Sequence, residues 1–594
     1  MLFLLLSWSS FLLTDVASLN LTVLHTNDIH AHFVQTNRRG TRCRPENKEK
    51  CVGGVARQLY VVRKFREELS NVLYLNAGDN YQGTAWYSIL KYKPVAEVME
   101  ILRPNAMTLG AHEFDDGPKG LAPFLSAMRD KVPVVCCNVN FSLSPELKHL
   151  QVSKSVVLKV ANTAVGVIGV ITAETNLISE PAPVFFEDDF ECIRQEARRL
   201  RNTGVKVLIA LTQVGYQEDL RLASNISEIS LVVGGHSHTF LYTGTKHPDE
   251  DIPQGPYPTV VSRTDGTNAL VVTAFRYGKY LGHIDLLYDD KGDLKSWSGA
   301  PIFLDGSITE DKQMLELLQT YQGNVTAASK AVIGYSKVLL IADNYVCQLQ
   351  ECNLGNFIAD ALFNYFAEKP LQTGGSWSMI NGCILDSGNI KGSLLPESDI
   401  LREDLLETIP FDNTLFIATL TGQHLRKVFE HSARKYPLNG ENPSSAFLQV
   451  SGIRVTYNMT KPADQRVHSL AILCTNCTVP HFELVEDNTM YNIAVPSFIA
   501  KGGYGYNFTG ATLADTGTVV LEAVERYFAK MSPVKAGIEK RITILRAAKI
   551  RPYRSDAASL QKLRLRSGIT YLLPCMVPTV YTFTMIISLA SYPT

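Results

Sequence analysis

Five segments in the amino-terminal half of the sequence place polar residues directly after an apolar run. These residues are Asp28 and His30, then Asp79, then His112 and Asp115, then Gln213, and finally His236 and His238. Mixed carboxylate and imidazole ligands suit zinc, manganese or iron. A carboxylate shared between two such ions forms a two-metal site for attack on phosphorus. The residue types therefore predict hydrolysis of a phosphate ester.

The elements that must position these residues follow one pattern between residues 19 and 304. β-branched apolar runs end at glycines or turns, which is typical of buried strands, and helical stretches at 94–102 and 190–201 lie between them. This is an α/β pattern. Ligands bind at the carboxyl ends of strands in such sheets, so we expect the five polar segments to converge on one site.

Composition places the chain among packed globular proteins. It has 594 residues, of which 45% are hydrophobic and 19% charged, and this length suffices for about two or three domains. The formal net charge is −1, and we find no basic stripe or aromatic-plus-basic repeat. Nucleic acid is therefore not an expected partner.

Both ends of the chain are typical of targeting segments. Residues 1–18 are apolar and end in small residues, as in a cleaved secretory signal peptide. Residues 549–594 combine a small-residue cluster, a basic spacer and an apolar tail, which is the order of a GPI-attachment signal. The alternative is one transmembrane helix, but Pro574 and Pro578 interrupt the tail, and Arg564 and Arg566 would lie outside the cell. We therefore predict a cell-surface or secreted protein.

Export predicts glycan acceptors and paired cysteines. N-x-S/T triplets begin at Asn20, Asn140, Asn225, Asn324, Asn458, Asn476 and Asn507. Three close cysteine pairs predict disulfides, namely Cys43 with Cys51, Cys347 with Cys352, and Cys474 with Cys477. The last pair is a CxxC, but it has no second CxxC and no histidine pair to complete a zinc site. The spacing leaves Cys136, Cys137, Cys192 and Cys383 unassigned.

Several longer motifs carry a resemblance to a known family. The segments are "LHTNDIHAHF", "AGDNYQGT", "LGAHEFDDG", "VVGGHSHTFLYTG", "ECNLGNFIADAL", "FEHSARKY" and "GGYGYNF". In this order they resemble the 5'-nucleotidase family of calcineurin-like metallophosphoesterases, over residues 19–545. The resemblance implies a four-layer α/β/β/α metallophosphoesterase sandwich and a second α/β nucleotide-binding domain, joined by a helical linker. The implied boundaries are 19–304 for the first domain, 305–328 for the linker region with its helix near 311–321, and 329–548 for the carboxyl-terminal substrate-binding domain.

The resemblance assigns metal ligands, and two of them are substituted. The first metal is expected at Asp28, His30 and His238, with Asp79 bridging to a second metal that His236 also binds. An asparagine and a histidine of the family's second site are Ala111 and Gln213 here. Gln213 offers only a neutral oxygen, so we predict one intact divalent-metal site, with zinc as the expected ion, and a weakened second site. The family's catalytic histidine and its aspartate partner are retained as His112 and Asp115.

The nucleotide-binding residues implied by the resemblance are also altered. An arginine is replaced by Gln348, an asparagine by Asp386, a second arginine by Lys391 and an acidic residue by Tyr504. The segment "INGC" offers a competing register for the loop that contains Asp386 and Lys391. The two aromatic residues that sandwich the base are expected to be Phe411 and Phe498, which could also be ordinary core residues. Cys383 faces Ala359 where the family has a cysteine partner, so we expect that disulfide to be absent.

Two functions follow from this pattern. The first is hydrolysis of AMP, ADP or ATP outside the cell, with reduced activity because electrostatic and positioning contributions have been lost together. The second is a non-catalytic protein that uses the same fold to bind a small molecule or a receptor. The resemblance also implies a possible homodimer through the carboxyl-terminal domain.

Overall fold

The computed structural model describes residues 19–545, except 44, 151, 370–375, 439 and 441. The predicted signal peptide at 1–18 and the predicted anchor signal at 549–594 lie outside these residues. Among the helices of the described part of the chain, none combines the length and the apolar character needed to cross a bilayer.

The amino-terminal part of the chain contains two six-stranded sheets. In the first, the strand order is β13-β12-β1-β2-β3, with β14 paired to β12. Its strands are β1 (Leu19–Thr26), β2 (Val72–Asn76), β3 (Ala106–Met107), β12 (Tyr280–Tyr288), β13 (Leu294–Gly299) and β14 (Ile302–Phe303). Strands β1, β2 and β3 run parallel, so their carboxyl ends meet at one edge.

The second sheet has the order β10-β11-β9-β8-β6-β5. Its strands are β5 (Ser155–Val160), β6 (Thr163–Ile171), β8 (Val207–Gln213), β9 (Leu231–Gly234), β10 (Thr259–Ser262) and β11 (Asn268–Val272). Strands β6, β8, β9 and β11 are parallel, and β8 is buried along its whole length, as its continuous apolar run predicts.

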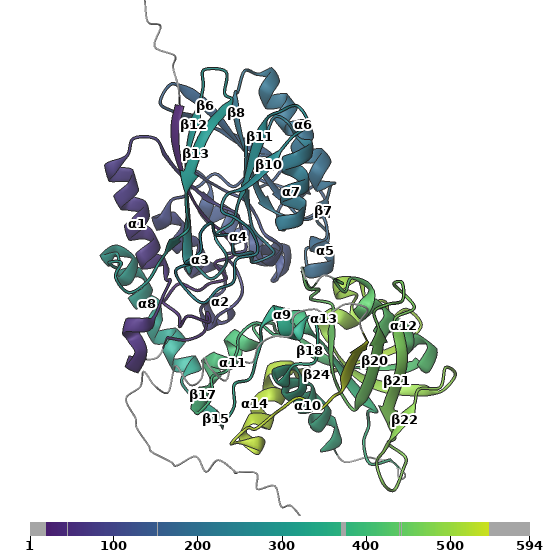
Figure 1. Ribbon diagram of the computed structural model, residues 1–594. Coiled ribbons are helices and arrows are strands. Elements are labelled where there is room, and N and C mark those ends of the chain that lie inside the picture. The colour runs from purple at the N-terminus through teal and green to yellow at the C-terminus, as the bar shows by residue number, and fades with distance from the viewer. Residues whose placement is uncertain are drawn as a thin grey trace, which may run out of the picture. The chain divides into compact units, whose positions relative to one another are not determined.

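Helices cover the outer faces of both sheets (Figure 1). They are α1 (Val55–Glu68), α2 (Ala85–Leu90), α3 (Tyr92–Leu102), α4 (Gly117–Met128), α5 (Thr175–Ile178), α6 (Asp189–Asn202) and α7 (Tyr216–Asn225). Helix α6 begins where the Asp188 side chain accepts a hydrogen bond from the Glu191 amide, and it buries Ile193, Ala197 and Leu200. A core that includes Val23 of the first sheet and Ile209 of the second joins the two sheets. The predicted four-layer α/β/β/α arrangement is confirmed.

A long helix follows the second sheet. Helix α8 spans Lys312–Ser329, and the Asp311 side chain caps its first turn by accepting from the Met314 amide. Met314, Leu318 and Val325 are buried on one face. The helix that the resemblance implies near 311–321 is therefore present, and it extends further than expected, to Ser329.

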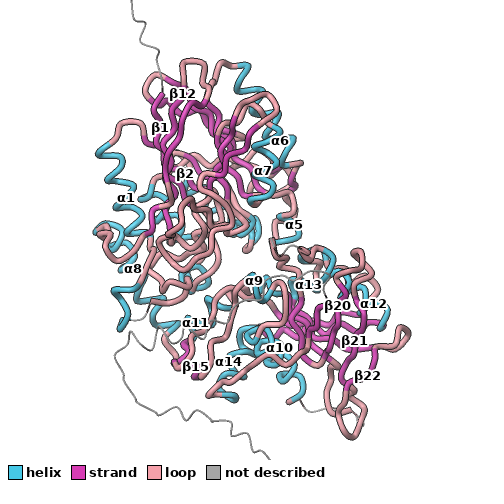
Figure 2. The backbone as a smooth tube through the Cα atoms, viewed as in Figure 1, coloured by secondary structure: helices cyan, strands magenta, loops and turns pink. Residues whose placement is uncertain are grey.

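The carboxyl-terminal part is a second α/β structure (Figure 2). A five-stranded sheet has the order β19-β16-β23-β18-β24, a four-stranded sheet β22-β21-β20-β25, and β15 pairs with β17. The strands are β15 (Val332–Ser336), β16 (Gly382–Asp386), β17 (Ser398–Leu401), β18 (Thr414–Thr421), β19 (Leu448–Ser451), β20 (Ile453–Asn458), β21 (Val467–Leu473), β22 (Phe482–Leu484), β23 (Met490–Pro496), β24 (Thr512–Val519) and β25 (Ile542–Leu545). The helices are α9 (Asn344–Cys347), α10 (Asn353–Ala367), α11 (Arg402–Thr408), α12 (Gly422–Arg434), α13 (Ser497–Ala500) and α14 (Val520–Met531).

Four disulfides occur among the described cysteines. The three predicted pairs, Cys43–Cys51, Cys347–Cys352 and Cys474–Cys477, are confirmed. The fourth joins Cys137 to Cys192. Cys136 and Cys383 are free and buried, and Ala359 lies buried on α10. The expectation that Cys383 has no disulfide partner is therefore confirmed.

Candidate metal centre and nucleotide cleft

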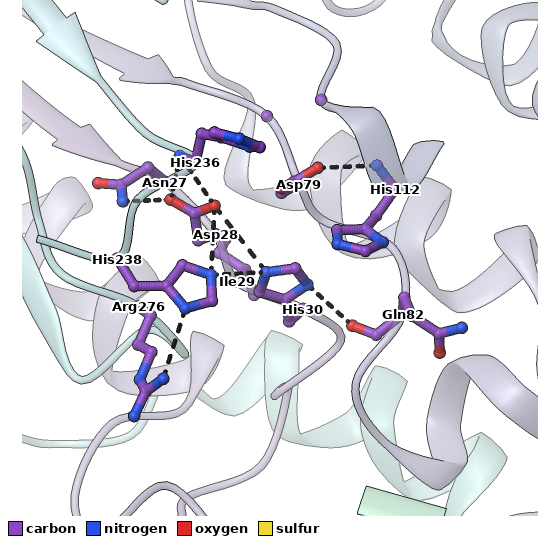
Figure 3. A network of polar contacts seen from close by, with 12 residues as sticks. Asn27, Asp28, Ile29, His30, Asp79, Gln82, His112, His236, His238 and Arg276 are labelled. Carbon is purple, nitrogen blue, oxygen red and sulfur yellow. Dashed lines mark hydrogen bonds and ion pairs between the residues drawn. The ribbon is translucent and has the colours of Figure 1, made fainter. Parts of the chain in front are cut away.

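The polar segments converge because the strands that precede them are parallel. Asp28 and His30 follow β1, Asp79 follows β2, and His236 and His238 follow β9. The short 3-10 helix Ala111–Phe114, which follows β3, contains His112. The carboxyl ends of the two sheets thus deliver the predicted ligands to one place, as shown in Figure 3.

Asp28, His30 and His238 form a compact group of ligand atoms. One such atom from each residue lies within 4.8 Å of the others, and the two Nε2 atoms of the histidines are 3.0 Å apart. The Nδ1 of His30 lies 3.1 Å from the Tyr81 carbonyl and 3.2 Å from that of Gln82, so Nδ1–H donates and leaves the Nε2 lone pair free. Burial lowers the pKa of His30 to about 3, so this imidazole is neutral. One carboxylate and two neutral imidazoles are a donor set that fits a divalent transition metal.

The carboxylates of Asp28 and Asp79 carry buried negative charge beside this group. Burial, followed by the charge of Asp79, raises the pKa of Asp28 well above its ordinary value. Burial would also raise the pKa of Asp79, but His112 and His30 outweigh it and the pKa is lowered. A bound cation would stabilise both ionised carboxylates, so their proximity also fits a metal site.

The expected second site has fewer ligands. Ala111 is buried and carries no donor atom. The Nε2 of Gln213 donates to Asp28 Oδ1 at 2.9 Å, while its Oε1 is buried with no hydrogen-bond partner among the described residues. His236 donates its backbone N–H to both carboxylate oxygens of Asp28. Gln213 therefore offers this position one neutral oxygen, beside Asp79 and the imidazole of His236.

The ligand loops have an unusual backbone. Five residues adopt left-handed conformations, with φ between 50° and 76°, namely Asp28, His30, Asp79, His236 and His238. Such conformations cost about 1–3 kcal/mol each for non-glycine residues and persist only where the surroundings impose them. The strain is concentrated where the side chains must meet.

Glu113, which the sequence analysis did not single out, holds the Asp79 loop. Its buried carboxylate accepts the backbone N–H groups of Asp79 at 3.0 Å, Asn80 at 2.7 Å and Tyr81 at 3.1 Å. Gly110 lies so close that a Cβ there would be 2.5 Å from the Asp79 nitrogen. The signal for Glu113 was its position inside the "HEFD" segment.

His112 and Asp115 form the expected pair. The ring Nδ1 lies 2.8 Å from Asp115 Oδ2, and Ser179 donates to the other carboxylate oxygen at 2.7 Å. Burial alone would lower the pKa of His112, but the charges of Asp115 and Asp79 raise it to about 9. His112 is therefore an imidazolium at neutral pH, with Nδ1 fixed by Asp115.

Of the carboxyl-terminal candidates, Phe411 reaches this centre and Lys391 lies against Phe411, while Asp386 binds Asn389 in the neighbouring turn. Asp386 ends β16, and Lys391 follows the turn after it, whereas "INGC" lies at the start of that strand. The Lys391 ammonium lies 5.5 Å from the Phe411 ring centre, and that ring is 5.9 Å from the His112 ring. Burial raises the pKa of Asp386 to about 7, and its Oδ2 has no partner among the described residues.

The other three candidates lie around the same turn. Gln348 is buried and donates to Ser445 Oγ at 3.2 Å, and the Ser445 carbonyl accepts from the backbone of Gly388. Tyr504 lies against Gly388 and packs edge-on against Phe498 at 4.9 Å. Phe498 thus contacts the residue that replaces the family's acid, while Phe411 faces His112.

Comparison with known proteins agrees with this geometry. A family model described as "Calcineurin-like phosphoesterase" matches residues 21–240, and one described as "5'-nucleotidase, C-terminal domain" matches 332–511. A 5'-nucleotidase of Mus musculus is 37% identical over 530 residues, which cover 88% of this chain and 90% of the relative. An apyrase of Tabanus yao is 35% identical over 532 residues, covering 88% and 94%. The crystal structure of a 5'-nucleotidase precursor from Thermus thermophilus has a TM-score of 0.81 and 32% identity, and the match covers 89% of this chain and 100% of that one.

Proposed function

Because this chain belongs to the 5'-nucleotidase family of calcineurin-like phosphoesterases, we propose that it is an extracellular nucleotide phosphohydrolase with one strong metal site and one weak one. Family membership supports nucleotide hydrolysis and dependence on a divalent metal. The observation that carries the finer proposal is the contrast between the compact Asp28–His30–His238 group and a second position where Ala111 and Gln213 stand.

The residues of the centre divide the work of phosphate ester hydrolysis. A divalent cation held by Asp28, His30 and His238, with Asp79 beside it, would supply Lewis-acid polarisation of a phosphoryl oxygen and a more acidic water. His112, protonated and fixed by Asp115, points its remaining N–H away from the carboxylate. That N–H stabilises negative charge on the phosphoryl group or gives its proton to the leaving oxygen.

The carboxyl-terminal part binds the nucleotide in this proposal. Phe411 and Phe498 hold the base, and Lys391 contacts phosphate as a point charge rather than as a guanidinium fork. Gln348, Asp386 and Tyr504 weaken this binding. The resemblance implies an arginine, an asparagine and an acidic residue at these three positions. We place the two domains at 19–304 and 329–548, with the 305–328 region between them.

The cell-surface assignment belongs to the same proposal. The four disulfides support an oxidising compartment. We propose a GPI anchor, zinc as the resident ion and a homodimer. Treatment of cells with phosphatidylinositol-specific phospholipase C tests the anchor and should release the protein. Retention of the protein on the membrane, with an epitope detectable on the cytoplasmic side, would contradict the GPI anchor.

A non-catalytic binding protein is the second candidate. The unpartnered Oδ2 of buried Asp386, beside the expected phosphate contacts, favours it because a carboxylate there repels a phosphate when ionised.

Metal content and AMP hydrolysis measured on one preparation test the proposed function. We expect close to one tightly bound ion per chain with slow release of phosphate. Ala111→Asn combined with Gln213→His should raise the content toward two ions. Gln195→His, which adds a histidine on the exposed face of α6, is the matched control and should leave the content unchanged. Two tightly bound ions and fast hydrolysis in the unmodified chain would refute the weak-site proposal.

A further inference from the structure

Arg276 lies next to the metal-ligand group on a loop that the sequence analysis did not select. Its Nη1 is 3.4 Å from Nδ1 of His238. A dashed line marks this contact in Figure 3. A guanidinium has no acceptor atom, and a neutral His238 that binds a metal through Nε2 carries its proton on Nδ1, so in the metal-bound centre this contact is a close approach and leaves the guanidinium N–H groups available to another ligand. Arg276 therefore stands beside the centre on the side of His238 that faces away from Asp28.

Hydrogen bonds and ring contacts fix the path of the loop that carries Arg276. The guanidinium carbon lies 5.3 Å from the Phe275 ring centre and 4.8 Å from that of Tyr277. Both aromatic residues have left-handed backbones, with φ of 64° and 59°, which is rare for bulky side chains. Asn27 donates to the Phe275 carbonyl at 2.7 Å, and the Tyr277 amide donates to the Asp28 carbonyl at 2.8 Å. The chain thus accepts strain to hold an arginine beside His238.

This arginine has no anionic partner. Within the described part of the chain, no carboxylate lies within ion-pair distance of Arg276, although it is half-buried. The same holds for Lys391, whose ammonium contacts the Phe411 ring. The Phe411 ring in turn lies 5.9 Å from the His112 ring, so Lys391 lies on the His112 side of the centre and Arg276 on the His238 side. Half-buried cations that make no direct ion pair are typical of a site that receives an anion.

We infer that Arg276 is a phosphate-binding residue of the cleft, which together with Lys391 supplies positive charge that the depleted second metal position lacks. The ligand class is a phosphate oxyanion, either the phosphate of a nucleotide or the free product. The planar guanidinium suits this role because it donates two parallel hydrogen bonds to one phosphate. This inference rests on the proposed function for the identity of the substrate, but not for the binding of phosphate itself.

Calorimetric titration of the full chain with inorganic phosphate tests the inference, with the metal content of each preparation measured in parallel. Arg276→Ala should weaken phosphate binding by about tenfold or more, as expected for a lost charge-assisted hydrogen bond. The phosphate affinity of Arg276→Lys should lie between those of Arg276→Ala and the unmodified chain, because lysine keeps the positive charge but cannot donate two parallel hydrogen bonds. Arg454→Ala is the matched control, since Arg454 also lies over an aromatic ring, that of Phe482, but on strand β20. It should bind phosphate as the unmodified chain does.

Each outcome of this titration decides the inference. Weaker binding at unchanged metal content supports it, and a parallel loss of AMP binding with unchanged adenosine binding extends it from free phosphate to the nucleotide. Unchanged phosphate binding in Arg276→Ala overturns it. Weaker binding that follows a loss of metal also overturns it, because Arg276 would then act through His238. A chain that binds phosphate through Arg276 but hydrolyses no nucleotide would refute the proposed hydrolysis and leave this inference intact.

Discussion

Asp115→Asn should lower the pKa of His112 by more than one unit. The pKa of this histidine rises from an ordinary 6.5 to about 9, even though burial opposes the rise. A shift of about 2.5 units corresponds to about 3 kcal/mol in favour of the imidazolium. Asp115 is the larger of the two charges responsible, and it also makes the 2.8 Å contact with Nδ1. Asparagine keeps the shape of the side chain and removes that charge.

Histidine NMR of chelator-treated protein, with His112 assigned by substitution, measures this pKa directly. Asp116→Asn is the matched control, because Asp116 binds the Tyr87 hydroxyl and Lys91 instead of the histidine. Its His112 should titrate as in the unmodified chain. In the chelator-treated unmodified protein the imidazolium should persist until the pH passes about 9, and in Asp115→Asn it should be lost at lower pH. An unchanged pKa in Asp115→Asn would refute the assignment of Asp115 as the stabilising partner.

Two further predictions concern stability. The pKa of Asp386 is raised from 3.8 to about 7 by burial, so the folded state loses stability as the pH rises between these values. Asp386→Asn should therefore raise the free energy of unfolding at pH 8 by up to about 4 kcal/mol and change it little below pH 3.8. Denaturant unfolding at the two pH values measures this difference. A gain of equal size at both pH values would contradict the burial argument. Replacing Cys137 and Cys192 by serine opens a loop with a sequence separation of 55 and should cost about 4 kcal/mol, against about 2 kcal/mol for the Cys474–Cys477 loop with a separation of 3. Equal losses in the same unfolding assay would show that strain or contacts, rather than loop entropy, set these values.

The sequence predicted the strands and their polar ends because both depend on local pattern. β1, β2, β8 and β9 are apolar runs, and parallel pairing brings their carboxyl ends together. The disulfide between Cys137 and Cys192 was not predictable in this way, because it depends on the fold. Cys136 and Cys137 are neighbours in the sequence, but they pack in different core clusters, and Cys137 lies in the cluster that contains its partner Cys192.

Glu113 and Arg276 escaped the sequence analysis for a related reason. Glu113 acts on backbone amides about thirty positions earlier, and Arg276 reaches His238 from the β11–β12 loop, 38 positions later. The "HEFD" segment contains Glu113 but does not show which groups its carboxylate binds, and no period or spacing marks Arg276. Their roles depend on how loops from distant parts of the chain meet, which follows from tertiary packing.

The left-handed backbone of the ligand loops limits which side chains this centre can exchange. Aspartate, asparagine and histidine tolerate that conformation better than most residues, and β-branched side chains scarcely adopt it. Asp28, His30, Asp79, His236 and His238 therefore occupy positions where few substitutions leave the loop path unchanged. Ala111 lies on a 3-10 turn and Gln213 ends a strand, and neither has a positive φ. The two positions at which the resemblance implies a substituted ligand are thus positions where a new side chain needs no left-handed backbone.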